Sequence, residues 1–166
     1  DMLTAAMTVI DNSWEIYEQL LQILDKQLQD KLNSEFSDLL AKGWQYERLD
    51  NFGNRYFHIF IDPPKGRHWG MGFEFYKSWF QDAYYGVWAH KKELSEKKYQ
   101  YLQEQFSEFV SRNKSNNFWL GWTWVEDNLR NWNAEIWAQI PNGQLAERLF
   151  EKLRPLLKIA KTIAIE

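Results

Sequence analysis

The residues best suited to chemistry lie in three short segments between positions 56 and 90. One carboxylate, Glu74, and two imidazoles, His58 and His90, occupy the same alternate phase of these segments. Carboxylate and imidazole groups are the usual oxygen and nitrogen ligands of zinc and manganese, and both serve as general acids or bases. The sequence contains neither an HxxxH nor an HExxH spacing. We therefore predict a binding surface without a metal or cofactor.

These segments, 56–62, 69–76 and 83–90, predict three strands of one antiparallel sheet. Alternate side chains of a strand point to opposite faces, and the connections are too short for parallel pairing. One phase is apolar and is expected to face a core; the other, here called the mixed face, combines aromatic, glycine and polar residues. The apolar phase consists of Phe57, Ile59, Ile61, Trp69, Met71, Phe73, Phe75, Ala83, Tyr85, Val87 and Ala89. The candidate binding residues of the mixed face are Tyr56, His58, Glu74, Tyr76, Tyr84, Trp88 and His90.

The composition of the turns suggests a register for these strands. A turn centred near Lys65 places Tyr56 opposite Glu74, and a connection centred near Phe80 places Gly86 opposite Glu74. In this register Glu74 lies between aromatic side chains in a shallow, glycine-floored groove, with the histidines close by.

The segment before the strands has helical periodicity. Its apolar residues recur every three or four positions from Met7 to Leu28, which is typical of a helix seam. A capping box of Asn12 and Glu15 predicts a start near Ser13, and the stripe continues to about Lys42. This seam either packs on the chain's own sheet or forms a homodimer, because three heptads are enough for a coiled coil.

The residues after the strands predict two further helices and one more pair of strands. A helix is expected over 95–112, and a last helix begins after Asn142 and is kinked or restarted by Pro155. Segment 118–125 predicts a strand, and 134–140 predicts its partner, with a helix as the alternative. The residues expected on one side of the first of these strands are Phe118, Leu120, Trp122 and Trp124.

With a further strand over 44–49, the chain is predicted to be a single α+β domain covering residues 1–166. Its centre is an antiparallel β-meander sheet, packed by the long N-terminal helix and two further helices. Its 45% hydrophobic content is typical of a domain with a real core. Because the first residue is Asp1 and not Met, we expect a fragment of a longer protein.

Composition excludes several classes of site and location. There is no cysteine, which rules out disulfides, thiolate metal sites and a cysteine nucleophile and favours the cytoplasm. No apolar stretch approaches the roughly 20 residues of a membrane helix. The net charge of −3 argues against nonspecific nucleic-acid binding, but residues 51–166 carry 16 basic and 13 acidic groups, which permits a local phosphate contact.

Three stretches, 55–61, 69–75 and 84–88, carry a family resemblance. Their sequences, RYFHIFI, WGMGFEF and YYGVW, resemble the C-terminal region of bacterial proteins classed with the PD-(D/E)XK nuclease superfamily. The resemblance covers about residues 13–160 and implies a region attached to a nuclease core. The superfamily's catalytic strand bears Asp/Glu-x-Lys; here Glu74 and Lys77 are three positions apart and point to opposite faces, so no catalytic residue is transferred.

The leading functional prediction is a non-catalytic recognition or accessory domain of a bacterial or phage protein. It would bind a protein or nucleic-acid partner through the mixed face, since aromatic surfaces stack bases and pack side chains equally well. Two alternatives stay open. One is a metal-dependent hydrolase or nuclease centred on Glu74, and the other is an assembly module that uses the N-terminal helix.

Overall fold

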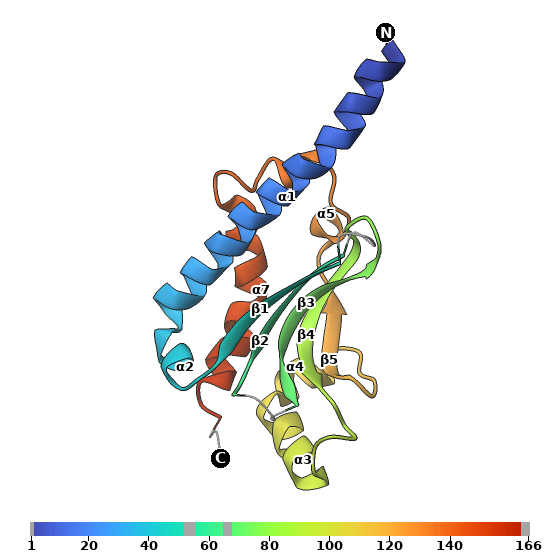
Figure 1. The fold of residues 1–166 in the computed structure, drawn as a ribbon. Coiled ribbons are helices and arrows are strands. Elements are labelled where there is room, and N and C mark those ends of the chain that lie inside the picture. The colour runs from blue at the N-terminus through green and yellow to red at the C-terminus, as the bar shows by residue number, and fades with distance from the viewer. Residues whose placement is uncertain (1, 52–55, 65–67, 164–166) are drawn as a thin grey trace.

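The computed structural model describes residues 2–51, 56–64 and 68–163, and within these it leaves the side chains of 3–12, 50, 51 and 56 undescribed. It confirms the α+β class: one antiparallel sheet is packed by helices (Figure 1). The strands are β1 (Gln45–Asn51), β2 (Tyr56–Asp62), β3 (Trp69–Lys77), β4 (Gln81–Ala89) and β5 (Trp119–Trp124). The helices are α1 (Met2–Glu35), α2 (Ser37–Ala41), α3 (Glu96–Gln105), α4 (Ser107–Ser111), α5 (Asp127–Arg130), α6 (Ala134–Trp137) and α7 (Gln144–Ala160).

The sheet is a meander in which the order of the strands across the sheet equals their order along the chain, with β5 beside β4. The predicted registers are both wrong by two residues. Glu74 lies opposite Tyr84 and not Gly86, because the β3–β4 turn is centred on Trp79. Between β2 and β3, Phe60 lies opposite Gly72. A shift of two positions keeps every side chain on its face, so the assignment of the two faces holds.

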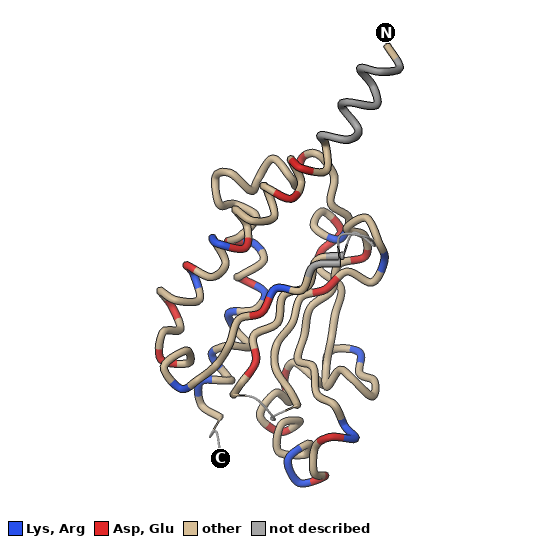
Figure 2. The backbone as a smooth tube through the Cα atoms, viewed as in Figure 1, with Lys and Arg blue, Asp and Glu red and all other residues tan. Residues whose placement is uncertain are grey.

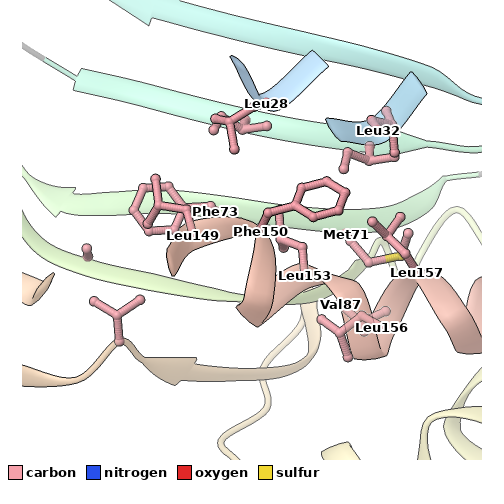
Figure 3. Close-up of a cluster of buried hydrophobic side chains, with 14 of the residues drawn as sticks. Leu28, Leu32, Met71, Phe73, Val87, Leu149, Phe150, Leu153, Leu156 and Leu157 are labelled. Atoms are coloured by element: carbon pink, nitrogen blue, oxygen red, sulfur yellow. The ribbon is translucent and has the colours of Figure 1, made fainter. Parts of the chain in front are cut away.

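The side chains of the apolar phase form one side of the hydrophobic core. Helices α1 and α7 lie together on this side of the sheet, and leucines from both meet Met71 and Phe73 (Figures 1 and 3). Phe57, Met71 and Phe73 are no more than 1% exposed. Where the two helices meet, Arg154 donates to both carboxylate oxygens of Glu35, at 2.6 and 2.8 Å. A paired guanidinium of this kind fixes the relative position of two helices better than a single-point contact.

Helix α1 is longer than predicted. It begins at Met2, so the helix runs through Ser13 and the predicted cap at Asn12 is wrong. The helix ends at Glu35, and the break falls at Phe36, whose φ of −134° is not helical.

The seam of α1 packs within the chain along its described part. Leu21, Leu24 and Leu28 are 1%, 0% and 2% exposed and belong to the core. The side chains of Met7 and Ile10, which begin the seam, lie outside the described residues. Homodimerisation through the seam from Met7 to Leu28 stays a prediction.

The predicted strand over 134–140 is wrong. Asn133 accepts a hydrogen bond from the backbone N–H of Ile136 at 3.1 Å, which starts the short helix α6. Ile136 and Trp137 then turn into the core, at 3% and 7% exposure. An alternation of apolar residues this short fits either structure, and here the capping residue decides for the helix.

The last helix also differs in detail from the prediction. It is capped at Gly143, whose φ is 78°, while Asn142 accepts a hydrogen bond from the N–H of Gln144. Helix α7 continues through Pro155 to its end. The carbonyl of Glu151, four residues earlier, loses its usual donor there, but both residues are exposed and water can replace the donor.

The predicted helix over 95–112 divides at Phe106 into α3 and α4. Ser95 caps α3 as expected, accepting a hydrogen bond from the N–H of Lys98 at 3.2 Å. Among the described residues, no helix combines the length and the apolar character needed to cross a membrane.

Candidate functional site: the mixed face of the sheet

The mixed face lies on the side of the sheet opposite α1 and α7. In Figure 1 no helix of the described chain crosses this side, and the central strands carry few charged residues (Figure 2). Tyr76 is 67% exposed, and Phe118, which precedes β5, is 62% exposed. The other described aromatic rings of this face are half-buried, except Trp119, which is buried at 7% exposure. The face is therefore a single aromatic layer open to solvent.

Three of the predicted site residues, His58, Glu74 and Tyr84, form a chain across β2, β3 and β4. The hydroxyl of Tyr84 donates a hydrogen bond to Oε2 of Glu74, and Oε1 of Glu74 lies 3.6 Å from Nδ1 of His58. Burial and the neighbouring Glu74 carboxylate raise the pKa of Tyr84. The phenol therefore stays protonated and acts as a donor that fixes the carboxylate.

Two further predicted residues, Trp88 and His90, border a hollow of about 350 Å³ whose lining includes Glu74. The ring centroids of Trp88 and His90 lie 5.3 Å apart, and those of His90 and Phe118 lie 5.5 Å apart. Of the remaining predictions, Tyr76 lies outside the hollow, beside Trp124, and the side chain of Tyr56 lies outside the described residues. The residues that line the hollow are Phe60, Glu74, Trp88, His90, Asn116, Phe118 and Trp119.

A glycine floor lets aromatic rings lie on the sheet. A Cβ atom on Gly72 would stand 2.9 Å from the ring of Phe60 and 3.1 Å from the ring of Trp119. A Cβ on Gly70 would stand 2.1 Å from Oδ1 of Asp62. Both glycines are thus required by close approach of side chains, as glycine in a strand interior often is.

Asp62 is a second half-buried carboxylate of the mixed face. It accepts a hydrogen bond from the indole N–H of Trp88 at 2.9 Å. Loss of solvent raises its pKa to about 7; the hydrogen bond from Trp88 opposes the increase, and the charge of Glu47 adds to it. The bond holds the indole in place at the edge of the hollow.

The tryptophans of β5 add a part of the face that the sequence prediction did not include. The pairing of β4 with β5 shifts between Val87 and Trp88, so that Val87 opposes Gly121 while Trp88 opposes Trp119. This bulge turns Leu120 into the core, where it is fully buried, whereas Trp122 and Trp124 share the mixed face. The prediction that these three side chains share one side is therefore wrong.

Cations cover the outer two of these tryptophans. The ammonium of Lys114 lies 5.2 Å from the ring centroid of Trp122, and the guanidinium of Arg130 lies 4.1 Å from that of Trp124. Such contacts attract because the face of an indole ring is electron-rich. The spacing W-x-x-W-x-W in residues 119–124 was the available signal, but only the bulge places all three rings on one face.

The geometry offers little to a metal ion. Across the part of the chain that the structure describes, no group of three or more His, Asp or Glu side chains could hold one. Glu74 has His58 as its nearest histidine, and its other oxygen is engaged by Tyr84.

Comparison with known proteins found no matching family model, and no curated protein or solved structure matched the chain either. The resemblance to the nuclease-associated region stays a prediction. Function is therefore inferred from the geometry of the mixed face.

Proposed function

We propose that the chain is a non-catalytic recognition domain that binds a segment of a partner protein through the mixed face. The supporting observation is that helices α1 and α7 cover the apolar face of the sheet, whereas the mixed face presents aromatic rings to solvent. Tyr76 and Phe118 keep about two thirds of their surface exposed. Aromatic side chains are enriched at protein interfaces and supply much of their binding energy.

The charges on this face favour a basic peptide over nucleic acid. Glu47, Asp62 and Glu74 lie on neighbouring strands of the mixed face, and no Lys or Arg of the described residues forms an ion pair with them. Lys114 and Arg130 at the β5 side of this face already cover tryptophan rings. Phosphate groups would meet carboxylates that no described Lys or Arg neutralises, whereas lysine and arginine side chains would be attracted.

The sequence resemblance extends the proposal to the parent protein. We propose that this domain accompanies a nuclease core in a bacterial or phage protein and acts there as an accessory module. In that setting a peptide-binding face would recruit a partner to the nuclease.

A selection from randomised 12-residue peptides tests the proposed surface directly. The immobilised chain should enrich peptides that combine Lys or Arg with an aromatic residue. Phe118→Ser should weaken binding of the enriched peptides by about tenfold or more, because loss of an interface aromatic at a binding hot spot costs about 2 kcal/mol or more. Ile16→Ser is the matched control: this α1 residue is also apolar and exposed, at 56%, and lies away from the face.

Two results would contradict the proposal. One is a set of enriched peptides that bind Phe118→Ser as tightly as the wild type. The other is tight binding of a 20-nucleotide single strand whose affinity falls steeply with salt, which would assign the face to nucleic acid.

A further inference from the structure

We propose that the hollow lined by Phe60, Trp88, Phe118, Trp119 and Glu74 binds an organic cation, specifically a quaternary or methylated ammonium group on the partner. This inference rests on the proposed function, because it identifies the side chain that the partner would insert into the mixed face. Three features of the hollow support this inference: the angles between its aromatic walls, its negative charge, and the contrast with the neighbouring tryptophans, which already bind cations.

The walls of the hollow meet at steep angles. The rings of Phe60 and Trp88 are inclined at 87°, and those of His90 and Phe118 at 77°. A flat nucleobase is held best between two parallel rings, whereas perpendicular rings form the sides of a box. A rounded group such as trimethylammonium can contact several walls of a box at once, as in the aromatic cages that bind such cations.

The hollow carries the negative charge of Glu74, and no Lys or Arg of the described residues forms an ion pair with it. The Glu74 side chain is only 18% exposed, and in the described part of the chain its polar contacts are with Tyr84 and His58. The hydroxyl of Tyr84 orients the carboxylate but contributes no positive charge. A half-buried carboxylate in aromatic surroundings gains from an incoming cation, because little solvent is present to screen the attraction.

Two neighbouring tryptophans of the mixed face already bind cations from the chain itself. Lys114 covers Trp122 and Arg130 covers Trp124. No described Lys or Arg lies over Phe60, Trp88, Phe118 or Trp119 in this way. The face thus binds cations of its own chain at one end and leaves the acidic, aromatic hollow for an external cation at the other.

Methylation of the ammonium group should favour binding because it removes N–H donors that would need hydrogen-bond acceptors in the hollow. An unmodified lysine ammonium brings three N–H donors, and each must find an acceptor when it is buried. The Glu74 carboxylate already accepts from Tyr84, so it cannot satisfy all three. A quaternary ammonium has no N–H donor and keeps its full charge, and it therefore loses less on entering the hollow.

Choline and its neutral isostere 3,3-dimethylbutan-1-ol provide a direct test by ¹⁵N-resolved NMR titration of the indole N–H signals. Choline should shift the signals of Trp88 and Trp119, and the isostere, which has the same shape without the charge, should bind at least about tenfold more weakly. Glu74→Gln and Phe118→Ala should each weaken choline binding by about tenfold. Ile16→Ala is the control, because this exposed apolar residue lies on α1, away from the mixed face, and it should leave choline binding unchanged.

Equal binding of choline and the isostere would overturn the inference, as would choline shifts at Trp122 and Trp124 without shifts at Trp88 and Trp119. A failure here is distinguishable from a failure of the proposed function. Peptides that bind the face in a Phe118-dependent way without any choline response would leave the recognition role intact and remove the cation pocket. Choline binding in the hollow with no peptide enriched would keep the pocket and remove the peptide role.

Discussion

The two faces of the sheet carry similar aromatic side chains but bury them differently. On the apolar face, Phe57, Phe73 and Phe75 are at most 2% exposed, and they stand under helices that complete a second layer. On the mixed face, rings such as Phe60 and Trp119 lie down over the sheet, on the space that Gly72 leaves. Burial on the mixed face therefore comes from neighbours within one layer, which leaves the outer surface of that layer available to a partner.

The largest expected difference between the two faces is in the loss of stability when an aromatic ring is removed. Phe73→Ala removes a ring that is 1% exposed and lies 5.4 Å from Phe75, so the free energy of unfolding should fall by about 3–5 kcal/mol. Phe118→Ala, on the exposed side, should change it by less than about 0.5 kcal/mol. Urea unfolding followed by circular dichroism measures both. Similar losses in the two variants would mean that the mixed face is also an interior.

A methyl group on the glycine floor should have an intermediate effect. Gly72→Ala forces the rings of Phe60 and Trp119 to move, and overpacking of this kind costs about 1–3 kcal/mol. In a Phe60→Ala background the same change should cost less, because one of the crowded rings is gone. The two differences can be read from urea midpoints. Strict additivity would show that the rings do not rest on Gly72.

The smallest expected effect concerns Asp62 and pH. Burial raises its pKa to about 7, compared with about 3.9 for an unfolded Asp, so the folded chain holds this proton more tightly. The stability that this proton contributes is present in acid and is lost as the pH rises from about 4 to about 7.

Asp62→Asn should remove that loss. Relative to the wild type, the variant should gain more than about 1 kcal/mol in unfolding free energy between pH 4.5 and pH 7.5, since one pKa unit corresponds to about 1.4 kcal/mol. Urea denaturation at the two pH values gives this difference. The carboxyls with lowered pKa values, such as Glu35 and Glu147, titrate alike in both proteins and therefore cancel from this difference. A difference that stays constant with pH would contradict the burial of Asp62.

The sequence predicted the two faces of the sheet well because the period of two survives a register shift of two residues. It did not predict the register. The β3–β4 turn depends on positive φ values at Trp79 (66°), Phe80 (57°) and Asp82 (56°), which bulky residues such as tryptophan and phenylalanine rarely adopt. The core position of Phe80 and the ion pairs of Asp82 with Lys77 and Arg130 support that conformation, and both arise only after folding.

The candidate site was predicted only in part, for a related reason. His58, Glu74 and Tyr84 follow from alternation alone, and the structure brings them together. The β5 tryptophans were missed because the bulge that re-aims Trp119 is set by pairing with β4, not by local sequence.

Hydroxyl-radical footprinting with a selected peptide tests the location of the binding surface most directly. In the free chain, Tyr76 and Phe118 should be modified rapidly and Phe73 hardly at all. Saturating peptide should protect Phe118 and the rim of the hollow while Ile16 and Ile23, exposed on α1, keep their rates. Unchanged modification of Phe118 together with protection of Ile16 and Ile23 would place the binding surface on α1 and contradict the role assigned to the mixed face.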